Sequence, residues 1–483
     1  MGDSLAGSLV RGAAAAMAAA VALAGAAPPE SGRVPTMARL ERERLARAEA
    51  DAAAQAAHRR PVPVRLGLND YRCVMHAHSD LSHDSRGTSA EIAAAAREAG
   101  VEAVFLTNHP QDRLDVVERG PRGRIGGVLF VPGAETRGFL AFPGDGRLPG
   151  PGLSDREFAQ AVRRSGGLVF AAHPEERADW DVPALNGMEV YNTHADFQEE
   201  AELLKGLRPR DSQGWARLFG LLEAFRLHPQ AAFAALADRP AENLRRYDLQ
   251  CAVGPFTAVA ANDSHQNTGF VVRGGADGRL VVEDPLGERL GELDPAHTPA
   301  ARLLFGEPAP GREALRRVLD PYVVSFRHVS THVLADAAAE RSLRRALALG
   351  RTYVAFDWMG DPSGTVFRAF RGRESHPPGA RVRGGGGLRL QAALPLPARV
   401  RILRDGAVVE EREAALVEAP GDSPGVYRME ADLRIGGEWR PWILTGAIRV
   451  ATPRPAASHR PRGGSTTVST TSARVRLTTS SGL

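Results

Sequence analysis

The chain has 483 residues, 43% hydrophobic and 24% charged, a composition typical of an ordinary globular protein with room for two domains. Its net charge is only +4, and its arginines alternate with Asp and Glu instead of forming basic blocks, which argues against a nucleic-acid surface. Cys73 and Cys251 form no CxxC pattern, so neither a thiolate zinc site nor a disulfide framework is expected. No apolar run reaches the roughly 18 residues that a membrane-spanning helix needs.

The first 60 residues read as an N-terminal extension. Residues 1–30 contain an alanine-rich stretch that begins after Arg11 and ends at Pro28. They have the outline of a secretory signal, which predicts a periplasmic or secreted protein. The alternative is a disordered alanine-rich segment on a cytoplasmic protein. Residues 31–60 are expected to form a helical linker, because residues 37–57 are rich in helix formers with Glu and Arg at helical spacing.

A dense group of histidines follows at the end of the first predicted strand. Three of the eight residues from position 76 to 83 are histidines, and Asp84 comes next. In an extended segment His76 and His78 lie on the same side of the strand, and neutral imidazole is the commonest metal ligand in proteins. The segment therefore predicts one edge of a metal site.

Five further apolar runs each end in a residue that can bind a metal. The runs and their terminal residues are 101–106 with His109, 127–131 with Glu135, 168–172 with His173, 187–192 with His194, and 256–261 with Asp263 and His265. Helical segments at 89–100 and 155–165, and a helical insertion at 197–250, lie between them. Strands that alternate with helices predict an α/β fold with a parallel sheet, whose strand tips converge on one pocket.

Some single positions leave alternatives open. Either His83 or Asp84 could complete the first segment, and His194 could be a ligand, a support for Asn192, or a surface residue. Glu135 is the only acidic residue at the third tip, and a carboxylate is the group best able to bridge two cations. Arg137 and Arg86 could fork onto a substrate phosphate or carboxylate, or could be ordinary surface arginines.

In order and in content, these tips resemble the polymerase and histidinol phosphatase (PHP) superfamily of metal-dependent phosphoesterases. The resemblance implies a distorted (βα)7-type barrel over residues 61–358 with a three-metal centre. It implies one metal held by His76, His78, Glu135 and Asp263, a second by Glu135, His173 and His194, and a third by His83, His109 and His265. Two departures from the family pattern are Asn108 in place of an aspartate and the run Ser82-His83-Asp84 in place of Ser-Asp-Gly.

The expected function is that of a metal-dependent hydrolase acting on a small molecule, with phosphate esters as the first substrate class. Two or three divalent cations (Zn, Mn or Fe) would hold a hydroxide for attack on phosphorus, with Glu135 and Asp263 as the catalytic carboxylates. A carbamate, amide or carboxyl-ester hydrolase with the same centre is the alternative within the enzyme class. A secreted metal-containing binding protein is the alternative outside it. The oligomeric state is not predicted.

The C-terminal third differs in texture. Alternating runs at 388–393, 398–403 and 426–433, with a tight turn at Asp405-Gly406, predict a small β-sandwich domain over residues 359–452. A β-rich region after the barrel resembles the branch of the superfamily that includes carbaryl hydrolase. His328 and His332 lack the glutamate of an HExxH motif, so we expect them to be solvated or packed against the barrel. Residues 453–483 are expected to be a disordered tail.

Overall fold

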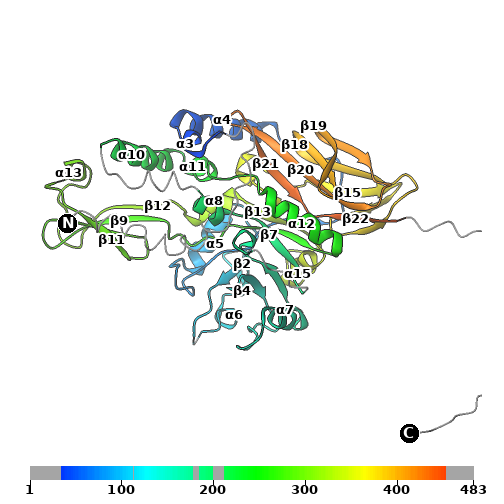
Figure 1. Cartoon of the computed structure of the whole chain (residues 1–483), viewed down its shortest axis with the longest axis horizontal. Coiled ribbons are helices and arrows are strands. Elements are labelled where there is room, and N and C mark those ends of the chain that lie inside the picture. Colours follow the sequence, from blue (N-terminus) through cyan, green and yellow to red (C-terminus); the bar gives the residue numbers. More distant parts are fainter. Residues whose placement is uncertain (1–33, 113, 178–183, 200–211, 298, 453–483) are drawn as a thin grey trace, which may run out of the picture.

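The computed structural model describes residues 34–112, 114–177, 184–199, 212–297 and 299–452 (Figure 1). The predicted signal-like segment at 1–30 and the predicted tail at 453–483 lie outside the described residues. The fold is mixed α/β, with one large sheet and a second sheet of four strands. No helix among the described residues is long and apolar enough to cross a membrane.

The six predicted strands with ligand-bearing tips are all present in the large sheet. They are β1 (Asn69–Val74), β2 (Ala103–Asn108), β4 (Val128–Thr136), β6 (Leu168–Ala171), β7 (Gly187–Asn192) and β8 (Thr257–Ala261). β1, β2 and β4 pair in parallel, and so do β6, β7 and β8. The burial of β2, β4, β6, β7 and β8 on both faces agrees with their nearly continuous apolar runs in the sequence, whereas β1 is buried only at Cys73 and Val74.

The predicted parallel sheet also contains antiparallel strands, and one of them interrupts the series of strands with ligand-bearing tips. Strand β5 (Phe139–Phe142) lies between β4 and β6 and is antiparallel to both. The chain reverses at Arg137 and Gly138, whose φ angles of 56° and 73° form a tight turn. Two reversals restore the original direction, so the carboxyl ends of β4 and β6 still face the same edge of the sheet.

Closure into a barrel stays a prediction. On its far side β1 pairs with antiparallel β13 (Ser330–Ala335), which pairs with β14 (Thr352–Ala355). Between the β1 and β8 tips the recorded pairing is a single parallel bridge, Ala77 with Ser264. On this side the β8 backbone makes hydrogen bonds to side chains of β13 and β14 in place of a backbone ladder. Ala260 N donates to Thr331 Oγ1 at 2.8 Å, and Ala258 O accepts from Thr352 Oγ1 at 2.9 Å.

Helices cover the sheet between its strands. Helices α5 (Ser89–Glu98) and α7 (Asp155–Arg164) match the two predicted segments, and each begins with a capping box. The described part of the predicted helical insertion contains α8 (Thr193–Glu199), α10 (Ser212–Leu227), α11 (Pro229–Ala234) and α12 (Ala241–Val253). The shorter elements of this half are α6 (Val116–Arg119), β3 (Gly123–Ile125), η1 (Pro174–Glu176), α14 (Tyr322–His328), α15 (Glu340–Ala348) and η2 (Asp357–Met359).

A second sheet that the sequence did not predict lies between β8 and α14. Its order is β11 (Arg289–Leu293), β10 (Leu280–Glu283), β9 (Gly269–Gly274), β12 (Glu313–Val318), all antiparallel, and α13 (Pro299–Phe305) accompanies it. Val272, Leu280, Val282 and Ala301 form its own small core. This antiparallel arm extends away from the C-terminal strands (Figure 1).

The C-terminal strands continue the large sheet, whereas the sequence predicted a separate sandwich. Strand β21 (Glu438–Thr445) pairs with β14, which joins the two parts of the chain by hydrogen bonds. The other strands are β15 (Val366–Arg371), β16 (Glu374–His376), β17 (Arg381–Arg383), β18 (Arg389–Arg404), β19 (Ala407–Pro420), β20 (Gly425–Ile435) and β22 (Ile448–Ala451). The turn predicted at Asp405-Gly406 joins β18 to β19, and both residues have positive φ. The domain boundary near residue 358 stays a prediction.

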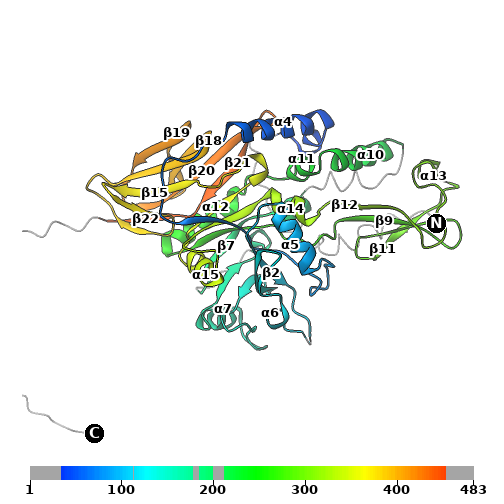
Figure 2. The same ribbon diagram turned by 180° about the vertical axis from the view of Figure 1, so that it is seen from behind.

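The helical linker is docked on both halves of the chain. It consists of α3 (Thr36–Arg39) and α4 (Arg42–His58), which lie beside the C-terminal strands and α11 (Figures 1 and 2). Arg39 is only 9% exposed and pairs with Glu438 at 2.9 Å and Asp238 at 3.2 Å. One side chain thus ties the linker to β21 and to the end of the α11 segment.

Candidate metal centre

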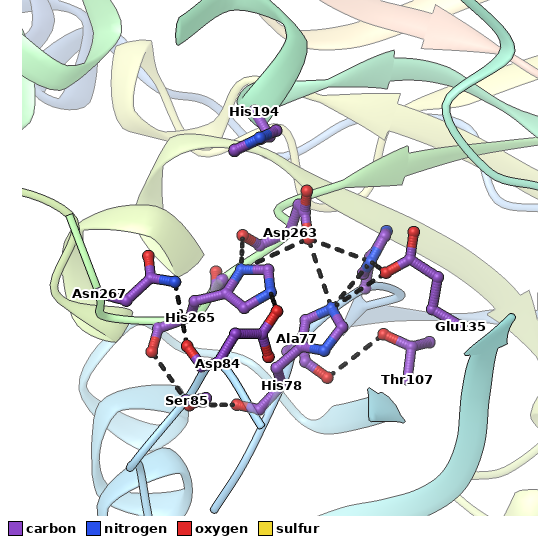
Figure 3. Close-up of polar contacts among 12 residues, drawn as sticks. Ala77, His78, Asp84, Ser85, Thr107, Glu135, His194, Asp263, His265 and Asn267 are labelled. Carbon is purple, nitrogen blue, oxygen red and sulfur yellow. Dashed lines mark hydrogen bonds and ion pairs between the residues drawn. The ribbon is translucent and has the colours of Figure 1, made fainter. Parts of the chain in front are cut away.

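The β1 tip sets the geometry of the centre. Ala77 is fixed on both sides, because its carbonyl accepts from Thr107 Oγ1 at 3.3 Å (Figure 3) and from Thr107 N at 2.9 Å, and its backbone forms the bridge to Ser264. His76 and His78 flank Ala77 and are fully buried. Their Nε2 atoms lie 3.1 Å apart, so the expectation that alternating residues present both rings to one space is met.

Two groups of four side chains gather at the strand tips, and in each group the potential ligand atoms lie within 4.8 Å of one another. The first group is His76, Glu135, His173 and Asp263. Glu135 Oε2 lies 3.0 Å from His76 Nε2, and Glu135 Oε1 lies 3.0 Å from His173 Nε2. Asp263 approaches the same rings, with its Oδ1 3.1 Å from His76 Nε2.

The second group is His78, Asp84, His109 and His265. Asp84 Oδ2 lies 3.1 Å from His265 Nε2 and 3.2 Å from His109 Nε2. The rings of His78 and His265 stack with centroids 3.9 Å apart. This group draws on the tips of β1, β2 and β8 and on the loop that follows β1.

Glu135 and Asp263 reach from the first group into the second. Glu135 Oε2 is 3.4 Å from His78 Nε2 and 3.6 Å from His109 Nε2. Asp263 Oδ1 is 3.4 Å from His78 Nε2 and 3.6 Å from His265 Nδ1 (Figure 3). The two groups therefore share carboxylates and form one centre.

The donor set fits divalent cations. Asp84 Oδ1 is buried without a hydrogen-bond partner, and the buried atoms Asp263 Oδ1 and His265 Nε2 have ion-pair contacts at 3.1 Å but no hydrogen bond, which is costly unless another group satisfies them. Imidazole and carboxylate ligands without thiolate suit Zn, Mn or Fe.

Burial and the neighbouring His265 lower the pKa of His78, whereas the carboxylates of the centre raise the pKa of several other rings. Burial acts to raise the pKa of Glu135, but His76 and His173 hold it well below its usual range. Burial acts to lower the pKa of His265, but Asp263 and Asp84 raise it to about 9. Protons thus balance the carboxylate charge in the metal-free chain, and a bound cation would displace them.

Backbone strain coincides with two of these side chains. His173 and Asp263 have φ angles of 44° and 48°, in the left-handed region that non-glycine residues rarely occupy. Such conformations persist where the surrounding structure enforces them, and they cluster at functional sites. Here they turn the His173 and Asp263 side chains toward the same carboxylate and imidazole atoms.

Glu189 supports the first group from behind. Its Oε1 lies 2.7 Å from His76 Nδ1, and its Oε2 accepts from His173 N at 2.9 Å and Asn192 Nδ2 at 3.0 Å. No role was predicted for Glu189 from the sequence. A glutamate inside a fully buried strand was the available signal, because such a charge must be paired.

Four predicted residues lie outside the two groups. His83 is exposed, with its ring 5.2 Å from that of His109, so the first segment contributes Asp84 instead. His194 is also exposed, with its ring 6.3 Å from that of His173. Arg137 pairs with Asp155 at 2.9 Å. Arg86 donates to the backbone carbonyls of His83 and Ser85.

The downstream histidines pack within the protein. His332 is buried between Asp70 Oδ1 at 2.8 Å and Asp357 Oδ1 at 2.9 Å. His328 is fully buried, and its Nε2 lies 3.0 Å from the Tyr191 hydroxyl. Of the two expected roles, packing against the strands is therefore the one observed.

Comparisons with known proteins give weak similarities. No protein-family model matches the chain, and no curated protein matches it. A two-domain protein from Bacteroides vulgatus containing a predicted PHP-like metal-dependent phosphoesterase is 13% identical, with 80% of this chain and 98% of that chain covered and a TM-score of 0.34. The β-glucuronidase 2 of Bacteroides uniformis is 10% identical, with coverages of 78% and 46% and a TM-score of 0.16. These scores are too low to establish a shared fold, so the functional proposal depends on the side chains.

Proposed function

We propose that this chain is a metal-dependent hydrolase of the PHP superfamily that cleaves phosphate esters of small molecules. The observation that carries the proposal is the position of Glu135, whose two oxygens contact histidines of both groups. A carboxylate between two sets of imidazoles is suited to hold two cations at the short spacing that two-metal hydrolases use.

The residues of the centre have separable tasks. Bound cations would supply a water of lowered pKa and a positive clamp on the oxygens of the substrate. Glu135 fixes the spacing between the groups, and His76 and His173 orient its two oxygens. Asp263 Oδ1 is buried between the two groups, 3.1 Å from His76 Nε2 and 3.4 Å from His78 Nε2, where it would accept a proton from the attacking water.

A carbamate, amide or carboxyl-ester hydrolase is the second candidate. The observation that favours it is the engagement of Arg137 by Asp155 and of Arg86 by backbone carbonyls, which removes the two guanidinium groups expected to bind phosphate. The β-rich region after β14 is what supports placement in the branch that includes carbaryl hydrolase. An extracytoplasmic location is a proposal that rests on the composition of residues 1–30 alone.

The test combines elemental analysis with a substrate panel. The purified full chain is analysed for Zn, Mn and Fe, then assayed with phosphate mono- and diesters, carbamates and carboxyl esters, with and without added Mn²⁺ or Zn²⁺. We expect about two or more cations per chain and hydrolysis of at least one phosphate ester. Glu135→Gln should lose both cations and turnover, while His297→Ala, which changes an exposed histidine of the antiparallel arm, should lose neither.

Three outcomes separate the alternatives. Turnover of carbamates or carboxyl esters without phosphate esters would move the chain to the second candidate. Stoichiometric metal without turnover of any class would favour a metal-containing binding protein. Fewer than one cation per chain, with no turnover after Mn²⁺ or Zn²⁺ is added, would contradict the proposal as a whole.

A further inference from the structure

We propose that Tyr322 is a positioning residue that fixes the second group of ligands, His78, Asp84, His109 and His265, and leaves the first group to other supports. The inference rests on the proposed function, because it concerns cations in the same centre. Tyr322 is the first residue of α14, which packs against α5 and α11 (Figure 2), and its side chain is 1% exposed. It is buried beside the strand tips although it lies 57 residues after His265 in the chain.

The Tyr322 hydroxyl contacts three segments that carry members of the second group, two at a backbone carbonyl and one at a side-chain hydroxyl. It donates to the carbonyl of His78 at 2.8 Å and lies 2.8 Å from the hydroxyl of Ser85, the neighbour of Asp84. It also lies 3.4 Å from the carbonyl of His265. A single buried hydroxyl thus joins the β1 tip, the loop after β1 and the β8 tip.

Ser85 completes the connection on the ligand side. Its hydroxyl donates to the carbonyl of His265 at 3.0 Å and lies 3.4 Å from the carbonyl of His78 (Figure 3). Asn267 adds a bond from its Nδ2 to the carbonyl of Asp84 at 3.0 Å. The loop that carries Asp84 is therefore bonded to the β8 tip at Asp84 itself and at Ser85.

The sequence leaves space for this hydroxyl at Gly87. A Cβ placed on Gly87 would lie 2.2 Å from the Tyr322 hydroxyl oxygen, which no side chain can tolerate without displacing the ring. The Gly87 carbonyl also accepts from Asp80 N at 2.9 Å and closes the loop around Ser85. The close approach of the tyrosine is thus built into the loop.

The antiparallel arm separates His265 from Tyr322 in sequence, and its two ends are held together at the site. The Asp320 carboxylate accepts from Asn267 N at 3.2 Å and from Thr268 N at 3.0 Å. Leu319 N donates to the carbonyl of Thr268 at 2.9 Å. These bonds bring the chain back to the metal centre at the end of the arm. Helix α14 therefore begins where the Tyr322 hydroxyl can reach the β1 tip, the loop after β1 and the β8 tip.

Within the part of the chain that the structure describes, Tyr322 makes no hydrogen bond to Glu135, His173 or Asp263 of the first group. The first group has its own support in Glu189. Loss of an outer support commonly costs about 10- to 100-fold in metal affinity. Removal of the Tyr322 hydroxyl should therefore weaken one class of cation site and spare the other.

The experiment is a titration of the metal-free full chain with Zn²⁺, and in parallel with Mn²⁺, followed by calorimetry. The variants are Tyr322→Phe, Ser85→Ala and Asp84→Asn, and the control is Tyr247→Phe, which removes a buried hydroxyl that donates to the carbonyl of Phe256 in another region. We expect Tyr322→Phe to weaken one class of site about 10- to 100-fold and leave the other unchanged. Asp84→Asn should weaken the same class of site. The double variant, Asp84→Asn with Tyr322→Phe, should keep the wild-type affinity of the other class.

Failure of the inference can be told from failure of the proposed function. If the wild-type chain binds no divalent cation, the metal centre itself is refuted, and this inference with it. If the wild-type chain binds cations and Tyr322→Phe weakens neither class, or weakens both equally, only the positioning role is overturned. If Tyr322→Phe does not fold, Ser85→Ala tests the positioning role by the same two outcomes.

Discussion

His76 Nδ1 lies 2.7 Å from Glu189 Oε1, and both side chains are fully buried. A carboxylate at this position fixes the ring so that its Nε2 atom faces Glu135 and Asp263. Burial acts to lower the pKa of His76, but Asp263, Glu135 and Glu189 together raise it well above its usual value. The second oxygen of Glu189 bonds the backbone of His173, so one buried glutamate supports two members of the first group.

Glu189→Gln should reduce the affinity of the first group for Zn²⁺ or Mn²⁺ by about 10- to 100-fold. The amide keeps the shape of the side chain but loses the charge that holds the ring of His76. Titration against a competing chelator measures the change, with Glu313→Gln on the antiparallel arm as the control. An affinity equal to that of the wild-type chain would show that Glu189 only fills its place in β7.

The choice between Asp84 and His83 can be made with two variants. Asp84 Oδ2 lies between His109 and His265, whereas the His83 side chain is exposed. Asp84→Asn should therefore lower the number of tightly bound cations per chain, and His83→Ala should not. Elemental analysis after dialysis distinguishes them, and loss of a cation in His83→Ala alone would reverse the assignment.

The raised pKa of His332 predicts that the free energy of unfolding falls in mildly alkaline solution. Burial acts against the charged ring, but Asp70 and Asp357 raise the pKa of His332 to about 9. The unfolded value is about 6.5, so the stabilisation is fully present below that pH and is lost as pH rises through about 9. Within this window the free energy of unfolding should fall by about 1.4 kcal/mol per pH unit.

Urea unfolding of the metal-free chain at several pH values measures this slope. His332→Gln should be less stable at neutral pH, because it leaves Asp70 and Asp357 without their cationic partner, and should lose the proton-linked part of the slope. If the free energy of unfolding of His332→Gln has the same pH slope as that of the wild-type chain, other groups cause the pH dependence.

Arg39 should be important for stability although it lies far from the strand tips. Its guanidinium pairs with Glu438 and Asp238 and donates to the carbonyls of Ala235 and Ala237. Arg39→Met should cost about 3–5 kcal/mol of unfolding free energy, the usual cost of breaking a buried ion pair. Arg44→Met, which removes a 45% exposed partner of Glu41, should cost no more than about 1 kcal/mol in the same urea titration. Equal costs for the two variants would contradict the docked linker.

The six strand tips could be predicted because each one repeats the same local pattern, an apolar run followed by a ligand. The antiparallel strand β5 could not, because its run of Phe139–Phe142 carries no ligand and its second partner, β6, follows only after helix α7. Glu135 was predicted to follow its strand, whereas it lies inside β4, because pairing with β5 extends that strand through Thr136.

Side-chain direction in the loops could not be predicted either. His83 and Asp84 are adjacent, and which of them faces the centre depends on the bonds that Ser85 makes to the β8 tip. From its position near the ligand Glu135, Arg137 could have faced a substrate, but it forms an ion pair with Asp155 at the start of α7. The antiparallel arm was missed because its short strands mix apolar residues with charges of both signs.

The most direct test of the account is a crystal structure of the chain grown with Zn²⁺ or Mn²⁺, with anomalous diffraction recorded at the absorption edge of that metal. The account predicts at least two anomalous peaks, each about 2.0–2.2 Å from its ligands. One should be bound by members of the group His76, Glu135, His173 and Asp263, and the other by members of the group His78, Asp84, His109 and His265. Metal-saturated crystals with no anomalous peak at either group would contradict the proposed metal centre.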